Sequence, residues 1–212
     1  MWSFVRLTEA KPAFWRRALA VGGVAWIAAL SLTTRAQLPY WHDSVSLFQR
    51  AIDVVPDNAL AQNNLGMALV EQNKMAEALD HFQTAVEITP WDTDARSNLG
   101  NALRALGRPA EAVVAYEKAL EQSPNDGTIH YNLATALVDL GRGDEAVTHL
   151  GGAVRLDPEY VKARFLLGTL FFRQGRVDDA LAQFREVARL EPQNARAGEW
   201  VRRIEAQLGR TP

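Results

Sequence analysis

Asparagine recurs at one fixed spacing: Asn64, Asn98 and Asn132 lie 34 residues apart. A carboxamide offers N–H donors and a carbonyl acceptor, so a row of them could hydrogen-bond the backbone of an extended peptide. Asparagine is a poor interior helix former. Three copies at the same repeat position in helical sequence therefore favour a functional role. The alternative is that they only cap or solvate helices. We expect the row to bind peptide and to end at Leu166, which occupies the next phase.

Other chemically capable residues show no catalytic pattern. Asp92-Thr93-Asp94 has the D-x-D form that glycosyltransferases use to hold a metal and a sugar nucleotide, but it precedes helical sequence, where aspartate caps free N–H groups. We favour capping. The histidines lack metal-ligand spacing and are expected on helix surfaces: His42, His81, His130 and His149. No serine lies in a G-x-S-x-G context. The sequence predicts no enzyme activity, no cofactor and no metal site.

Composition narrows the class further. The 212 residues are 48% hydrophobic and 23% charged, as in a folded protein. A net charge of -2 supplies no basic field for nucleic acid. There is no cysteine, so disulfides and thiolate ligands are excluded. Charge is uneven: residues 1–36 carry five basic and one acidic side chain, whereas the remaining 176 carry 18 basic and 24 acidic.

Prolines mark a 34-residue period, which predicts a solenoid. They are Pro56, Pro90, Pro124, Pro158 and Pro192. Four repeats then cover residues 59–194, and their bounds are 59–92, 93–126, 127–160 and 161–194. The period also orders the apolar residues, with leucine at position 7, a small residue at position 8 and a large one at position 24. Position 15 holds Asn73, Gly107, Gly141 and Gly175, types that tolerate the left-handed conformation ending a helix.

This pattern resembles the tetratricopeptide repeat, which implies an all-α solenoid of helix-turn-helix units with a right-handed superhelix. The usual aromatic at position 4 is replaced by Gln62, Arg96, His130 and Arg164. Residues 37–58 are predicted to contain a lone lead-in helix, a half repeat. Residues 195–212 are predicted to form a C-terminal capping helix, because Trp200, Val201, Ile204 and Leu208 make an apolar stripe.

The repeat phase also predicts which side chains line the concave groove. Besides the asparagine row they are those at positions 5 and 9, chiefly Asn63, Met67, Asn101, Tyr131 and Phe165. We expect this groove to be polar toward its N-terminal end and aromatic toward its C-terminal end. It lacks the position-5 lysines with which related repeats bind chaperone tails, so that ligand class is disfavoured.

Residues 18–34 are a stretch without a charge, bounded by Arg17 and Arg35. At about 1.5 Å per residue it spans roughly 25 Å, the short end for a transmembrane helix. We predict that residues 1–36 form a membrane anchor; a cleaved signal peptide and a buried soluble helix are the alternatives. Four basic residues precede the stretch, so the N-terminus is expected in the cytoplasm and the repeats on the non-cytoplasmic side of a bacterial inner membrane.

The junction after this stretch carries a second resemblance. Tyr40-Trp41-His42-Asp43-Ser44, followed by Leu47-Phe48, is similar to sequence after the last membrane helix of bacterial relatives of the transmembrane and tetratricopeptide-repeat-containing O-mannosyltransferases. The earlier membrane helices that make that family transferases have no counterpart in these 212 residues, so the activity is not carried over.

We therefore predict a membrane-anchored scaffold that holds an extended segment of a partner protein. The alternative is a non-catalytic module or subunit of a membrane protein glycosyltransferase, which would then be its partner.

One helix is expected to be weak. Gly151 and Gly152 lie in the second helix of the third repeat, where each glycine costs roughly 1 kcal/mol relative to alanine. Leu150, where the other repeats have an aromatic, is expected to bury less surface. We predict a flexible seam over residues 145–156; the alternative is that the glycines allow an unusually close helix contact.

Overall fold

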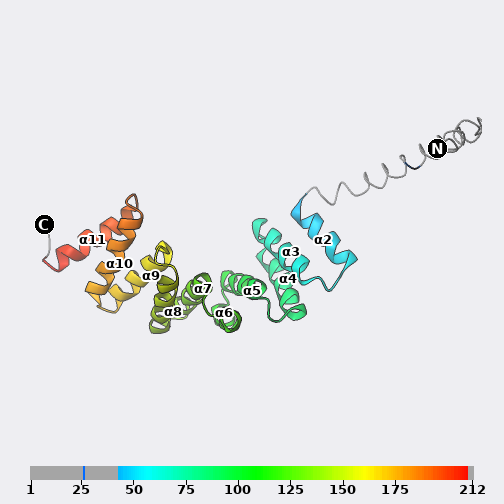
Figure 1. The fold of residues 1–212 in the computed structure, drawn as a ribbon, viewed down its shortest axis with the longest axis horizontal. Helices are drawn as coiled ribbons and strands as arrows, with labels where there is room; N and C mark the ends of the chain where they lie inside the picture. Colours follow the sequence, from blue (N-terminus) through cyan, green and yellow to red (C-terminus); the bar gives the residue numbers. More distant parts are fainter. Residues whose placement is uncertain (1–25, 27–42, 210–212) are drawn as a thin grey trace, which may run out of the picture.

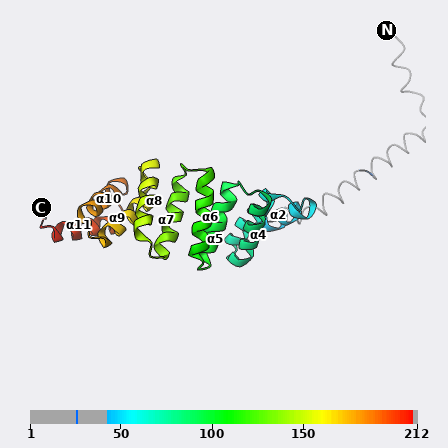
Figure 2. The same cartoon turned by 90° about the horizontal axis from the view of Figure 1, so that it is seen from below.

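The computed structural model describes residue 26 and residues 43–209. This part holds ten α-helices and no strand. Along the chain they are α2 (Ser44–Val54), α3 (Ala59–Glu71), α4 (Met75–Ile88), α5 (Thr93–Ala105), α6 (Pro109–Gln122), α7 (Gly127–Asp139), α8 (Gly143–Leu156), α9 (Val161–Arg173), α10 (Val177–Leu190) and α11 (Ala195–Gln207). They follow one another in an elongated row from α2 to α11 (Figures 1 and 2).

The helices pair as hairpins, and each hairpin packs on the next. Helices α3 and α4, α5 and α6, α7 and α8, and α9 and α10 form the four hairpins, and α4, α6, α8 and α10 each also contact the following helix. Helix α2 packs on α3, and α11 packs on α10. The described part is therefore an all-α solenoid, as the period predicted.

Local sequence sets where the helices begin and end. The side chains of Asp43, Asn58, Asp92, Asp126 and Asn194 accept backbone N–H bonds at the N-termini of α2, α3, α5, α7 and α11. Position 15 has the predicted left-handed backbone, with φ of 62° at Asn73, 74° at Gly107 and Gly141, and 75° at Gly175. The chain can therefore turn sharply into each second helix.

Positions 8 and 24 pack against each other inside each hairpin. A Cβ placed on Gly66 would lie 2.6 Å from Cε1 of Phe82, and one on Gly100 would lie 2.6 Å from Cε1 of Tyr116. Glycine is thus required because an aromatic ring occupies the space a larger residue would fill. In the fourth repeat the same approach, at Gly168, is 3.2 Å.

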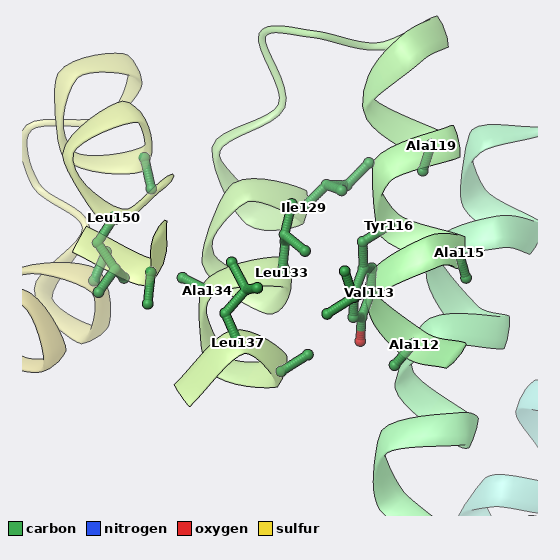
Figure 3. Packing of buried hydrophobic residues seen from close by; sticks show 14 of the residues in the cluster. Ala112, Val113, Ala115, Tyr116, Ala119, Ile129, Leu133, Ala134, Leu137 and Leu150 are labelled. Carbon is green, nitrogen blue, oxygen red and sulfur yellow. The ribbon is translucent and has the colours of Figure 1, made fainter. Parts of the chain in front are cut away.

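The third repeat satisfies the same packing with different residues. Ala134 replaces the glycine and Leu150 replaces the aromatic, and both are fully buried. In Figure 3, Ala134 of α7 points toward Leu150 of α8, while Ile129 and Leu133 lie toward Tyr116 of α6. Ala134 is larger than the glycine of the other repeats and Leu150 is smaller than their aromatic residue, so the pair fills the site without exposed surface. That Leu150 weakens this repeat stays a prediction.

Helix α8 runs without interruption through both glycines. A Cβ on Gly151 would meet nothing within 4 Å, and one on Gly152 would lie 3.6 Å from the His130 ring, an ordinary van der Waals contact. No backbone approach requires either glycine, so the close-contact alternative is wrong. The flexible seam stays a prediction.

Helix α11 covers the C-terminal end of the core. Its Ala197 and Ile204 are fully buried, and the Trp200 ring stacks on Phe184 at a centroid distance of 5.2 Å.

Within residue 26 and residues 43–209, no helix is long and apolar enough to cross a membrane. The predicted anchor at 18–34, apart from Trp26, lies outside the described residues.

Candidate peptide-binding groove

The first helices of the repeats, α3, α5, α7 and α9, together with α11, carry a continuous surface that we call the first-helix face. Side-chain contacts join neighbouring helices along it. Asn98 of α5 donates from Nδ2 to Oδ1 of Asn63 on α3, at 2.9 Å. Arg104 of α5 pairs with Asp139 of α7, with Nε 2.6 Å from Oδ2. The residues predicted to bind peptide all belong to these first helices.

The three phased asparagines have different surroundings. Asn64 lines a hollow of about 230 Å³ between α2 and α3, together with Ser44 and Phe48. Asn98 uses one of its N–H groups on Asn63 and keeps its carbonyl oxygen for another partner. Asn132 is half-buried, and its backbone carbonyl accepts a bond from the Thr135 hydroxyl. The asparagines therefore do not form a row of equivalent, free carboxamides.

Asn63 and Asn101 differ from the open groove contacts that sequence position predicted. Asn63 is buried, with 6% of its surface exposed, and it serves as the acceptor that orients Asn98. Asn101 is exposed, but its Oδ1 accepts from the Tyr116 hydroxyl at 2.7 Å. Burial raises the pKa of Tyr116, so the phenol stays a neutral donor. Both asparagines thus form hydrogen bonds with other side chains of the protein.

A shallow apolar hollow of about 300 Å³ lies between α3 and α5. Met67, which is 48% exposed, lines it together with Val70, Phe82 and Asn98. The predicted groove residues Met67, Asn98 and Asn101 thus share one site. Its lining combines thioether, aliphatic and aromatic carbon with the two amides, and the Glu71 carboxylate borders it.

A larger hollow, the C-terminal pocket, lies where α7, α9 and α11 meet. Its volume is about 570 Å³. Apolar and hydroxyl side chains line it, and they are Tyr131, Thr135, Val138, Val161, Phe165, Leu166 and Thr169. Tyr131 and Phe165 are brought together here as the sequence predicted. The volume and lining suit an apolar side chain of a bound molecule.

Charged residues border this pocket. Arg104 and Asp139 neutralise each other in the ion pair that joins α5 to α7. Arg196 of α11 lies over the Phe165 ring, with Cζ 4.8 Å from the ring centroid. Lys162 of α9 and Glu191 also line the pocket, and Glu191 accepts from Nδ2 of Asn194 at 2.9 Å. Lys162, Arg196 and Leu166 were missed as site residues, although Lys162 and Arg196 are 34 residues apart at one repeat phase.

In the second, third and fourth repeats the position-4 residue that replaces the usual aromatic bonds to the carbonyl of the preceding proline, whereas Gln62 of the first repeat bonds to His81. Arg164 donates from Nε to the carbonyl of Pro158 at 2.7 Å, and His130 Nε2 lies 3.1 Å from the carbonyl of Pro124. His130 also contacts His149 of α8, with 3.0 Å between their Nδ1 atoms. Both histidines are half-buried between α7 and α8, which corrects the surface placement expected for them.

The D-x-D segment functions as a helix cap. Asp92 accepts the backbone N–H of Ala95 at 3.0 Å at the start of α5. Among residue 26 and residues 43–209, no group of three or more histidine, aspartate or glutamate side chains is placed to hold a metal ion.

The fold and the groove define a helical-repeat solenoid with a candidate ligand-binding face. Three family models, each described as a tetratricopeptide repeat, match residues 59–125, 103–153 and 131–195. The chain therefore carries tetratricopeptide repeats. No curated protein matches the chain.

Solved structures share the fold. The crystal structure of YrrB, a TPR protein with an unusual peptide-binding site, has a TM-score of 0.68 and 29% identity, and the match covers 77% of this chain and 84% of that one. A crystal structure of MamA has a TM-score of 0.67 and 18% identity, over 72% and 89% of the two chains. A thermophilic TPR protein of Thermus thermophilus, TTC0263, has a TM-score of 0.59 and 22% identity, over 83% and 95%.

Proposed function

We propose that this protein is an interaction scaffold that holds an extended segment of a partner protein along the first-helix face. The observation that carries the proposal is the C-terminal pocket, about 570 Å³ and lined by Tyr131, Phe165 and Leu166. That volume lies within the roughly 300–1,000 Å³ typical of ligand sites. Apolar side chains of a peptide that enter such a pocket are removed from contact with water, and this burial favours binding.

The arrangement of the face supports an extended ligand rather than a compact one. The C-terminal pocket, the hollow between α3 and α5 and the hollow beside Asn64 follow one another along the solenoid. A repeat solenoid presents such an elongated surface because each unit packs mainly on its neighbours. Asn98, with a free carbonyl oxygen, could accept a backbone N–H of the segment between the pockets.

The likeness to YrrB is consistent with this proposal, since that protein is described as having a peptide-binding site. MamA and TTC0263, at 18% and 22% identity, support only the fold. The proposed role is binding and not catalysis.

Site-specific photocrosslinking tests the proposal. We would place benzoylphenylalanine at Met67 and Arg196, which are exposed toward opposite ends of the first-helix face, and at Lys118, exposed on the second helix α6, as the control. The full chain would be irradiated in detergent-solubilised membranes. Crosslinks from Met67 and Arg196 should map to two separate positions within one continuous segment of one partner. Equal crosslinking from Lys118, or crosslinks scattered over unrelated proteins, would contradict the proposal.

The proposal includes a membrane tether formed by residues 18–34, with the repeats on the non-cytoplasmic side. The asymmetry of basic residues around that stretch supports it. Protease added outside spheroplasts should then digest the repeats, and protection until lysis would contradict the topology. The alternative, a non-catalytic module of a membrane O-mannosyltransferase-like enzyme, rests on the sequence around Tyr40 and Trp41. Co-purification with such an enzyme would favour it.

A further inference from the structure

The C-terminal pocket carries positive charge that has no ion-pair partner among the described residues. Lys162 and Arg196 line the pocket, and neither makes an ion pair within residues 43–209. Arg196 instead lies over the face of Phe165, which holds its guanidinium against the apolar lining. The other arginine of the pocket, Arg104, is already neutralised by Asp139.

This charge runs against that of the surrounding molecule. Residues 37–212 carry 18 basic and 24 acidic side chains, a net charge of -6. Within the pocket the count is reversed: Lys162, Arg104 and Arg196 face Asp139 and Glu191. A site of opposite sign to the rest of the surface selects ligands by their charge and repels those of its own sign.

The pocket is lined by apolar side chains as well as by charged ones. Tyr131, Phe165 and Leu166 form part of that lining, and they provide burial for carbon rather than for a second charge. A ligand that satisfies the whole pocket must therefore combine an apolar side chain with a carboxylate a short distance along the same segment.

We propose that the C-terminal pocket selects segments in which an aliphatic or aromatic residue is next to an acidic residue. The apolar side chain enters between Tyr131 and Leu166, and the carboxylate binds Lys162 and Arg196. This inference rests on the proposed function, because it assigns chemistry to the segment that the first-helix face holds.

Selection from a random library of displayed dodecapeptides tests this, with the purified full chain in detergent as the target. Selected peptides whose binding depends on Leu166 should be enriched in aspartate or glutamate beside leucine, isoleucine or phenylalanine. Their affinity should fall roughly fivefold or more in the Lys162→Glu/Arg196→Glu variant. It should also fall as salt is raised, since exposed charge pairs are screened.

A matched control makes the same change in net charge elsewhere. Lys118 on α6 and Arg155 on α8 are exposed, lie on second helices and form no ion pair in the described residues. The Lys118→Glu/Arg155→Glu variant should retain affinity. If both double variants lose it equally, net charge alone explains the effect and the inference is wrong.

The remaining outcomes separate this inference from the proposed function. Peptides that depend on Leu166 but show no acidic enrichment, or that tolerate Lys162→Glu/Arg196→Glu, would overturn the inference and leave peptide binding in place. If no selected peptide depends on any residue of the first-helix face, both fail. Circular dichroism of each variant would show that the helices are retained.

Discussion

The two halves of the first-helix face use their side chains differently. Toward the N-terminus, polar side chains of α3 and α5 already have partners within the protein: Asn98 donates to Asn63 across the two helices, and Asn101 accepts from Tyr116 of α6. Toward the C-terminus, on α9 and α11, Lys162 and Arg196 have no ion-pair partner in the described residues, beside a pocket of about 570 Å³. A polar residue in a groove is thus not a free binding group, because its neighbours can satisfy it first. The C-terminal half of the face therefore has more side chains that are available to bind a ligand.

Replacing Leu166 with asparagine gives the largest expected effect on this comparison. The substitution would complete the asparagine row with a fourth copy, but it would remove a half-buried side chain from the C-terminal pocket. We expect a loss of about tenfold in affinity for a pocket-binding peptide, since burying part of a leucine contributes about 1–1.5 kcal/mol. Fluorescence polarisation with a library-selected peptide would measure it.

Leu156→Asn provides the control for this change, because Leu156 is 39% exposed at the end of α8, outside the pocket. The affinity of the Leu156→Asn variant for the same peptide should match that of the unchanged chain. A gain in affinity for Leu166→Asn would show that the asparagine row, and not the apolar pocket, dominates binding.

The third repeat joins the two halves of the face. Replacing its two glycines is expected to give the next largest effect. A Cβ fits at Gly151 without contact and at Gly152 at ordinary distance. The Gly151→Ala/Gly152→Ala variant should therefore raise the free energy of unfolding by about 1–2 kcal/mol, measured in urea. Gly100→Ala is the contrast: its Cβ would collide with Tyr116, and overpacking should destabilise by about 1–3 kcal/mol.

Hydrogen exchange in the unchanged chain tests whether this joint is flexible. Amides of residues 145–156 should exchange faster than those of 77–88 and 111–122, which are the matched stretches of α4 and α6. The double alanine variant should slow exchange in 145–156 selectively. Equal rates in the unchanged chain would show that the two halves are joined rigidly.

Removing the three phased asparagines should affect peptide binding less than Leu166→Asn. For Asn64, Asn98 and Asn132 changed together to alanine we expect about threefold weaker binding with unchanged helicity, since a neutral hydrogen bond contributes only about 1 kcal/mol. Restoring Asn98 alone should recover some stability, because Asn63 is otherwise buried without its donor. Unchanged peptide affinity would reduce the asparagines to structural and surface roles.

The smallest expected effect is a dependence on pH at the joint. Burial, and then the nearby His130, lower the pKa of His149 in the folded chain. Its unfolded form therefore takes up a proton first, so stability falls as pH drops below about 6.5. His149→Gln should flatten this part of the urea-unfolding profile. Burial also lowers the pKa of His81, so a residual slope should remain and vanish only when both histidines are replaced.

Much of this protein is determined by its sequence alone, because the signals are local. The 34-residue period fixed four hairpins, and Asn73, Gly107, Gly141 and Gly175 marked turns whose φ is positive. Asp92 was predicted to cap a helix, and it does. Each of these depends on backbone geometry within a few residues, which residue type controls directly. The anchor at 18–34 is likewise local, and it stays a prediction.

Tertiary structure alone decided which groove residues remain free. Asn63 and Asn98 are 35 residues apart, and His130 and His149 are 19 apart, so no local pattern shows that they bond to each other. Leu166 interrupts the asparagine row in the sequence, but in the structure it lines the C-terminal pocket of about 570 Å³. The reason is physical: hydrogen bonding and burial depend on what neighbouring helices bring within about 3–4 Å. A repeat period gives the phase of a side chain but not its partner.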